Sequence, residues 1–158
     1  MDTVRVHFSA AGTFVLAANV DDASIDNTTA GVNLTGNPLA NRLTGNNLAN
    51  VLLGLGGNDQ LNGLNGADSL TGGAGRDTLY GGAGNDTLYY ESEADELYGG
   101  VDDDRFAAGD PTKQIDGTTH VLNGGSGEDR LELRGAAADY RVRVVIPSSG
   151  SWEATTTT

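Results

Sequence analysis

Two consecutive nine-residue blocks, GGAGRDTLY (residues 72–80) and GGAGNDTLY (residues 81–89), differ at a single position. Both blocks have glycine at positions 1, 2 and 4, aspartate at position 6 and leucine at position 8. The glycines permit backbone angles that residues with a Cβ avoid, so positions 1 to 6 are typical of a tight turn. A leucine between two outward-facing residues has the alternation of a very short strand. The blocks therefore predict a coil of short strands with a carboxylate in every turn.

The apolar period extends well beyond these two blocks. In the same frame, position 8 is a large apolar residue in every block from Leu34 to Phe106. The frame then slips by seven residues at 108–114 and resumes with Leu122 and Leu131. Two blocks close one coil, so alternate leucines point inward from two facing sheets. We expect an all-β solenoid with neighbouring strands of each sheet about 4.8 Å apart.

Position 6 divides the chain into an uncharged part and an acidic part. It is asparagine at Asn41 and Asn50, and His120 occupies it after the slip. Position 6 of the first block is Val32, and the remaining blocks place aspartate there: Asp59, Asp68, Asp77, Asp86, Asp95, Asp104 and Asp129. Each of these aspartates, taken singly, could simply accept hydrogen bonds within its turn. Their strict register with glycines favours a metal site instead.

Composition limits the classes of protein that this chain can represent. Its 158 residues suit one domain, with 24 glycines, no cysteine and a formal charge of −13. An acidic chain is unsuited to nucleic acid, which requires a basic face. No segment approaches the ~20 apolar residues that span a bilayer, and residues 1–18 lack the pattern of a cleavable signal peptide. A disordered, low-complexity chain is the alternative, chiefly without ligand, because closely spaced aspartates repel one another.

The repeat resembles the RTX, or hemolysin-type calcium-binding, family, whose nonapeptide is GGxGxDxUx with U a large apolar residue. The resemblance covers residues 36–107 well and 115–132 more loosely. It implies a right-handed parallel β-roll with two nonapeptides per coil. Early blocks of the form GNxLANxL resemble the degenerate repeats that precede calcium-binding ones in this family.

Calcium takes about six to eight oxygen ligands, and mixes carboxylates with backbone carbonyls. Two stacked turns are needed to surround an ion, and stacked turns are eighteen residues apart, so aspartates should pair at that spacing. The pairs are Asp59/Asp77 and Asp77/Asp95 on one side, and Asp68/Asp86 and Asp86/Asp104 on the other. Asp104/Asp129 forms a fifth site if the coil regains its register after the slip. Magnesium fits less well, because it demands a tighter octahedron.

The glycines of these turns complete the predicted sites through their backbone. They are Gly54, Gly57, Gly63, Gly66, Gly72, Gly75, Gly81, Gly84 and Gly99. Residues 90–98 (YESEADELY) contain no glycine, so Asp95 is expected in a distorted turn with Glu91 or Glu93 as substitute ligands. Asn41 and Asn50 could ligate without charge, but we favour a stacked asparagine ladder.

The array divides the chain into five segments, with short β caps expected at both ends. Residues 3–8 and 13–16 are expected as strands near the N-terminus, and residues 139–146 as an edge strand near the other end. The segments are 1–26 (N-terminal cap and lead-in strands), 27–53 (degenerate Asn-type repeats), 54–107 (calcium-binding repeats), 108–132 (insertion and final repeats) and 133–158 (capping strand and flexible tail).

The sequence predicts a calcium-binding structural module that folds on binding about four Ca²⁺ ions, with a fifth across the insertion. It belongs to an extracellular or cell-surface protein, with neighbouring domains or a surface assembly as partners. No nucleophile–base pair or paired catalytic acid is supported, so we expect no enzyme. The alternative is an adhesin, or a surface-assembly or virion-type structural protein, that uses the rigid face for binding. Outward tyrosines at Tyr80, Tyr89 and Tyr98 are its main support.

Overall fold

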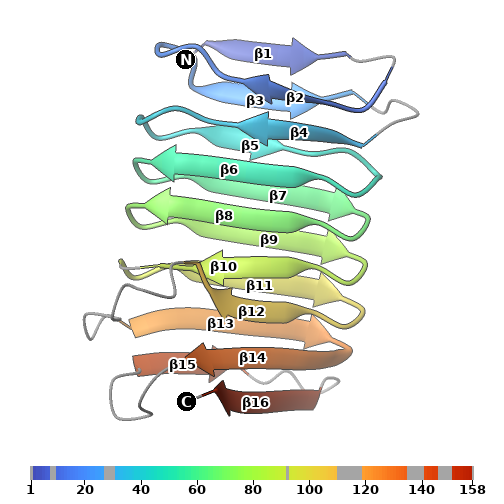
Figure 1. Cartoon of the computed structure of the whole chain (residues 1–158), viewed down its shortest axis with the longest axis vertical. Helices are drawn as coiled ribbons and strands as arrows, with labels where there is room; N and C mark the ends of the chain where they lie inside the picture. Colours follow the sequence, from blue (N-terminus) through green and yellow to red (C-terminus); the bar gives the residue numbers. More distant parts are fainter. Residues whose placement is uncertain are drawn as a thin grey trace.

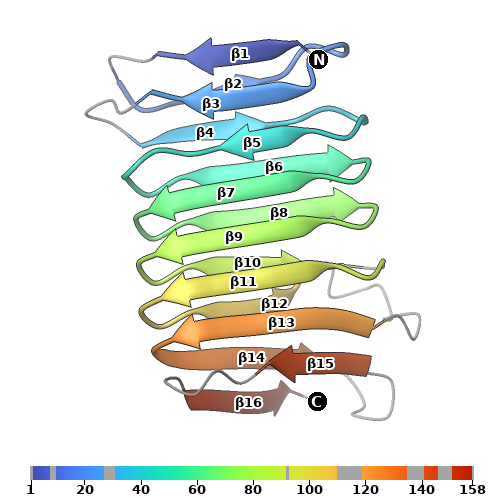
Figure 2. The ribbon, with the colours of Figure 1, turned by 180° about the vertical axis from the view of Figure 1, so that it is seen from behind.

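A computed structural model shows a β-solenoid built from two parallel sheets that face each other (Figures 1 and 2). The described part of the chain contains no helix. The predicted all-β parallel roll is therefore confirmed. The structure describes residues 2–7, 10–26, 31–91, 93–109, 119–134, 141–145 and 151–157.

The chain alternates between the two sheets, so odd-numbered strands form sheet A and even-numbered strands form sheet B. Two strands thus make one coil, as the nine-residue period predicts. Sheet A contains β1 (Thr3–Val6), β3 (Asp22–Ile25), β5 (Arg42–Thr44), β7 (Gln60–Asn65), β9 (Thr78–Ala83), β11 (Glu96–Val101), β13 (Thr119–Ser126) and β15 (Arg141–Val145). Sheet B contains β2 (Gly12–Val15), β4 (Val32–Thr35), β6 (Val51–Gly56), β8 (Ser69–Ala74), β10 (Thr87–Tyr90), β12 (Arg105–Ala108), β14 (Glu128–Arg134) and β16 (Ser151–Thr157).

The position 8 residues form the core. Each pairs in register with its equivalent one coil away, as Leu61 does with Leu79 and Leu79 with Leu97. From Leu34 to Leu131 none of them is more than 3% exposed. Each buried leucine contributes about 1.5–3 kcal/mol of transfer free energy, so the ladder is the main apolar support of a narrow roll.

The insertion lengthens the distance along the chain between paired residues from 18 to 25 positions, but the strands on either side stay in register. Leu97 pairs with Leu122 and Phe106 with Leu131, and the turn residues Asp104 and Asp129 stay adjacent although they are 25 positions apart. Residues 110–118, which include most of the predicted insertion, lie outside the described residues. The coil therefore regains its frame after the slip, as the fifth predicted site requires.

The two ends of the chain supply the outermost strands of both sheets. β1 and β2 occupy the predicted N-terminal strand regions, although β1 ends at Val6 and Phe8 lies outside the described residues. β15 falls within the predicted edge strand at 139–146. Within segment 133–158, which was expected to contain a capping strand and a flexible tail, residues 151–157 form β16, which pairs with β14 over seven residues. Repeated threonines favour strands, and this tendency is consistent with β16.

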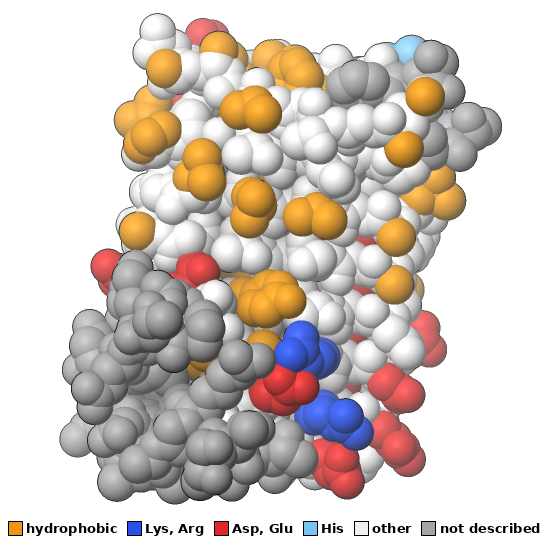
Figure 3. Space-filling view, viewed as in Figure 1, with side chains coloured by type: hydrophobic (Ala, Val, Ile, Leu, Met, Phe, Trp, Pro, Cys, Tyr) orange, Lys and Arg blue, Asp and Glu red, His pale blue; other side chains and the backbone are white. Residues whose placement is uncertain are grey.

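The outer face of sheet B is divided by charge. In Figure 3 the basic side chains visible on this face and most of the acidic ones lie in its C-terminal half. Arg105 pairs there with Glu132 at 2.5 Å, and Arg130 with Glu153 at 3.4 Å. On sheet A, the rings of Tyr80 and Tyr98 stack with centroids 5.1 Å apart.

Candidate metal centre

The position 6 side chains lie at the ends of the turns and form two columns along the roll. Column A stands at the turns that lead into sheet A, and column B at the turns that lead into sheet B. Column A consists of Asn41, Asp59, Asp77, Asp95 and His120, and column B of Asn50, Asp68, Asp86, Asp104 and Asp129. All ten side chains belong to residues less than 5% exposed. The structure therefore brings together every aspartate that the sequence paired.

Each column is held by a repeated hydrogen bond from one coil to the next. The backbone N–H of Asp59 donates to Oδ1 of Asp77 at 2.7 Å, and the N–H of Asp68 donates to Oδ1 of Asp86 at 2.7 Å. The same bond joins Asp104 to Asp129 across the insertion, at 3.1 Å. One carboxylate oxygen of every aspartate in the columns is thus used by the fold itself.

The second carboxylate oxygen distinguishes six aspartates from the rest. Within the described structure, Oδ2 is buried without a hydrogen-bond partner in Asp59, Asp68, Asp77, Asp86, Asp104 and Asp129. An ionised oxygen buried in this way is costly unless a cation or a proton neutralises it. Six such oxygens in two stacked columns would be stabilised by bound cations.

Burial also changes the acidity of these groups. Loss of water raises the pKa of Asp59 and Asp86 to about 6, of Asp68 and Asp77 to about 7, and of Asp104 to about 8. The backbone N–H that each Oδ1 accepts lowers the pKa, but desolvation is the larger effect. A nearby cation would favour the ionised form and oppose the shift.

The six turns that carry these aspartates share a backbone conformation, and we call them open turns. Positions 2 and 4 have positive φ in each, for example 106° at Gly73 and 124° at Gly75. Three residues adopt this conformation without being glycine, at φ values of 84° for Leu55, 82° for Leu64 and 78° for Asp102. Asp tolerates the left-handed region better than leucine does, so Leu55 and Leu64 are the strained positions.

Position 1 of an open turn needs glycine for a different reason. A Cβ at Gly54, Gly72 or Gly81 would lie less than 3.0 Å from Oδ2 of the aspartate in the same block. It would also lie less than 3.0 Å from the position 1 carbonyl oxygen of the next coil at Gly54 and Gly81. The missing side chain therefore leaves a cradle onto which carboxylate and carbonyl oxygens converge.

Three other turns, which we call closed turns, satisfy their position 6 side chain internally. The N–H of Asn37 donates to Oδ1 of Asn41 at 2.8 Å, and Asn46 bonds Asn50 in the same way. The N–H of Glu91 donates to Oδ2 of Asp95 at 3.0 Å. None of the described residues in these three turns has positive φ. In these turns a backbone N–H of the same turn therefore satisfies an oxygen of the position 6 side chain, and no cation is needed for that oxygen.

The asparagines differ in detail from the expected amide ladder. Nδ2 of Asn41 donates to the carbonyl oxygen of Val20 at 3.1 Å, and Nδ2 of Asn50 to that of Val32 at 2.7 Å. Both amides thus bond the backbone of the preceding coil. An amide–amide step occurs on the turn surface instead, where Asn65 donates to Asn47 at 2.9 Å.

In column A the open turns end before Asp95, whose turn is closed. Tyr90 stands where an open turn has glycine, and its buried ring packs 5.2 Å from the ring of His120. Nδ1 of His120 accepts the N–H of Asp95 at 3.2 Å. Glu91 and Glu93 reach back one coil and accept the N–H groups of Gly73 and Gly75, at 2.6 and 3.3 Å.

Three glycines of the Asp129 turn were not among the predicted ligand residues. Gly124, Gly125 and Gly127 give residues 124–129 (GGSGED) a complete open turn. The signal was present in the sequence, because this hexamer matches the glycine and aspartate positions of the twin blocks.

The donor set suits calcium. In the described residues, no group of three or more His, Cys, Asp or Glu side chains is placed to hold a metal ion. An ion between two open turns would therefore have two aspartates and complete its shell with backbone carbonyls. Calcium accepts this mixture of oxygen ligands.

Comparison with known proteins agrees with this chemistry. A family model that describes four copies of the RTX calcium-binding nonapeptide repeat matches residues 35–70, 62–97 and 91–110. Residues 35–110 belong to the RTX repeat family. RTX repeats bind calcium, and they form a structural module rather than an enzyme family. The β-roll is therefore a calcium-binding module.

The open turns of this chain extend past the matched region, because residues 124–129 lie beyond residue 110. The chain has no match among curated proteins or among solved structures. The described residues include no helix with the length and apolar character needed to cross a membrane.

Proposed function

We propose that this chain is a structural β-roll that folds when it binds calcium, as part of a secreted or cell-surface protein. The observation that carries the proposal is the set of six buried Oδ2 atoms without partners, stacked in two columns. Without cations these carboxylates repel one another and oppose folding. Calcium supplies the positive charge that the buried oxygens lack, so its binding free energy becomes folding free energy.

The two kinds of turn suggest which pairs hold ions. Pairs in which both turns are open are Asp59/Asp77, Asp68/Asp86, Asp86/Asp104 and Asp104/Asp129. In the predicted pair Asp77/Asp95, the second turn is closed and Asp95 already accepts the N–H of Glu91. We therefore assign four ions, one in column A and three in column B. The Asp104/Asp129 site replaces Asp77/Asp95 among the four.

Calcium-dependent folding is the reason for proposing an extracellular or cell-surface location. A module of this kind would stay largely unfolded where free calcium is scarce and become rigid where it is abundant, as outside a cell. This behaviour suits a protein that is exported before it folds.

Calcium titration tests the proposal directly. Far-ultraviolet circular dichroism should change from coil to β as calcium rises to millimolar concentration, and should revert with chelator. Calorimetric titration should count about four ions per chain. A spectrum and a heat signal that are both indifferent to calcium would overturn the proposal.

A binding surface is the second candidate, and the stacked Tyr80 and Tyr98 favour it. Tyr80 is 37% exposed, and the pair presents two parallel rings on the face of sheet A. Aromatic rings of this kind can stack on sugars, but cross-strand packing explains them equally well. A glycan array probed with the calcium-bound protein and with Tyr80→Ala separates the two explanations. Binding that depends on Tyr80 supports an adhesin.

A further inference from the structure

The last two open turns of column B are far more acidic than the other four. Turn 99–104 contains Asp102 and Asp103 beside Asp104, and turn 124–129 contains Glu128 beside Asp129. The four turns at 54–59, 63–68, 72–77 and 81–86 have no acidic residue except the aspartate at position 6. One of them carries Arg76 instead. Glu91 and Glu93 approach turn 72–77 only from the coil after it.

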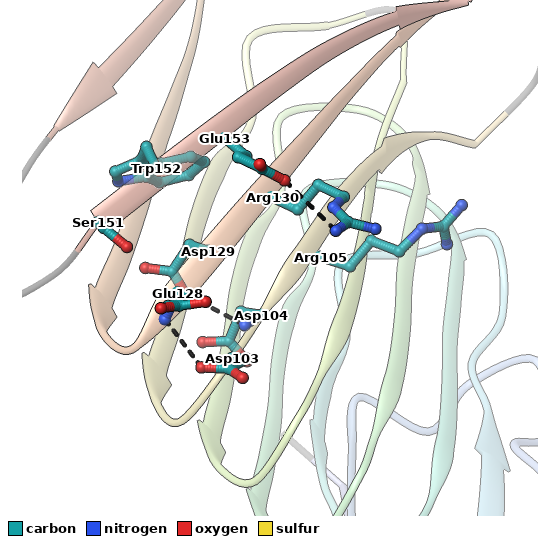
Figure 4. A pocket seen from close by; sticks show the side chains of 9 residues that line it. All are labelled: Asp103, Asp104, Arg105, Glu128, Asp129, Arg130, Ser151, Trp152 and Glu153. Atoms are coloured by element: carbon teal, nitrogen blue, oxygen red, sulfur yellow. Dashed lines mark hydrogen bonds and ion pairs between the residues drawn. The ribbon is translucent and has the colours of Figure 1, made fainter.

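The additional carboxylates lie beside the Asp104/Asp129 pair. Oδ1 of Asp103 accepts the N–H of Glu128 at 2.8 Å, so the Asp103 side chain reaches across to the next turn. The charges of Asp102 and Asp129 both act on Asp104, and that of Asp103 acts on Asp129. Figure 4 shows Asp103, Asp104, Glu128 and Asp129 gathered at the turn end of a pocket.

Two buried atoms indicate that this cluster faces a ligand. Oδ2 of Asp104 and Oδ2 of Asp129 lack a partner, and the two residues are only 2% and 1% exposed. Both residues line the pocket of about 660 Å³. The cluster therefore combines exposed negative charge with buried oxygens that no group of the described protein satisfies.

We propose that the Asp104/Asp129 pair is the tightest divalent-cation site of the array. The inference rests on the proposed calcium function and ranks its sites. Affinity of oxygen sites for calcium rises with the number of nearby carboxylates, and three additional negative charges should tighten binding by about tenfold over Asp59/Asp77 and Asp68/Asp86. An ion here also fastens the coil after the insertion to the coil before it.

Trp152 offers a local reporter of this site. It is the single tryptophan of the chain, it lines the same pocket, and it stands in register with Asp129 on the neighbouring strand. Its ring packs against Phe106 with centroids 5.1 Å apart. Tb³⁺ resembles calcium in size and luminesces when a nearby tryptophan transfers energy to it. Tryptophan-sensitised luminescence therefore reports a cation bound at this pair.

The experiment titrates the full chain with Tb³⁺ and follows tryptophan-sensitised luminescence, circular dichroism and total binding in parallel. The sensitised signal should saturate at a free ion concentration about tenfold below the midpoint of the Asp59/Asp77 and Asp68/Asp86 sites, and calcium should displace the bound Tb³⁺. Trp152→Phe should abolish the signal without changing the number of ions.

The key variant neutralises the additional carboxylates and keeps both ligands. Asp102→Asn, Asp103→Asn and Glu128→Gln together should raise the Tb³⁺ concentration at which the sensitised signal saturates about tenfold and leave the Asp59/Asp77 and Asp68/Asp86 sites unchanged. Asn at 102 tolerates the left-handed backbone, so the turn is preserved. The matched control is Asp2→Asn, Asp22→Asn and Asp26→Asn, which removes the same charge at the opposite end of the roll.

The possible outcomes distinguish a failure of the affinity ranking from a failure of the proposed calcium function. If the signal saturates last or is absent while calorimetry shows calcium binding, the ranking is wrong and the proposed function stands. Equal effects of the two triple variants would also overturn the ranking. If neither calcium nor Tb³⁺ binds at all, the proposed function and the ranking both fail.

Discussion

At the scale of single residues, the two oxygens of each column aspartate have separate tasks. Oδ1 joins neighbouring coils by accepting a backbone N–H, and it does so in open and closed turns alike. Oδ2 has no partner in the open turns and is satisfied in the Asp95 turn. The open turns and the Asp95 turn therefore differ at one atom, Oδ2 of the position 6 aspartate.

Asp86→Asn should remove more bound calcium than Asp95→Asn. Asp86 stands between two pairs of open turns, so its loss should lower the calorimetric ion count by about two. Asp95 belongs to a closed turn, so its substitution should change the count little. Without calcium, Asp86→Asn should stabilise the roll, because it removes an unpartnered buried charge. Equal ion counts in the two variants would contradict the assignment.

Stability should depend on pH in opposite ways with and without calcium. The pKa of Asp59, Asp68, Asp77, Asp86 and Asp104 rises from 3.8 to between about 6 and 8 in the roll. The folded chain without metal therefore binds more protons than the unfolded chain between about pH 4 and pH 8, and its free energy of unfolding should fall as pH rises through this window.

With calcium bound the same carboxylates must be ionised, so lowering the pH through this window should release the ions and destabilise the roll. Thermal unfolding at several pH values, in chelator and in calcium, checks both signs. A parallel dependence in the two conditions would contradict the role given to these aspartates.

At the scale of the turn, the glycines at position 1 act by leaving space and those at positions 2 and 4 by accepting positive φ. These are separate requirements, because Leu55 replaces glycine at position 2 of its turn. All six open turns have glycine at position 1. The cradle in front of the carboxylate is therefore the stricter condition.

Gly81→Ala should impair calcium-induced folding, whereas Gly56→Ala should not. A Cβ at Gly81 would lie less than 3.0 Å from Oδ2 of Asp86 and from the carbonyl oxygen of Gly99. A Cβ at Gly56 would meet its nearest atoms at 3.8 and 3.9 Å, which is ordinary contact. We expect a loss of about 2–4 kcal/mol for Gly81→Ala, measured by urea unfolding in calcium. A calcium midpoint unchanged by Gly81→Ala would count against the cradle.

At the scale of the whole molecule, the roll is a one-dimensional stack with a single column of leucines on each side. Every coil contacts mainly its neighbours, so stability approximates a sum over coils and their interfaces. The narrow core leaves no second layer to compensate for a lost side chain. The roll therefore depends on its leucine ladder as much as on its ions.

Leu79→Ala should destabilise the calcium-bound roll by about 2–5 kcal/mol, because it leaves a cavity in the ladder. Leu39→Ala is the matched control, since Leu39 is 48% exposed and its truncation should cost less than about 0.5 kcal/mol. Denaturant unfolding in saturating calcium compares the two. Similar losses for both variants would show that the ladder does not form the core.

Much of the fold was predictable because the period of the sequence equals the period of the structure. Position 8 identified the buried leucines, and the two-block coil fixed the eighteen-residue spacing between aspartates. Strand β16 was not predictable, because SWEATTT (residues 151–157) carries no repeat and becomes a strand only by pairing with β14. Strand formation there depends on an available sheet edge, which no local pattern reveals.

Residue order alone is sufficient to predict the roll, the calcium chemistry and the residues that line the columns. Glycine spacing, carboxylate spacing and the apolar period each follow directly from residue order. Which aspartates have an Oδ2 without a partner follows only from the folded structure, because it depends on whether an N–H of the same turn reaches the carboxylate. The contact between Asp104 and Asp129 also follows only from the fold. Their separation of 25 residues departs from the period of 18, and stacking of the two coils brings them together.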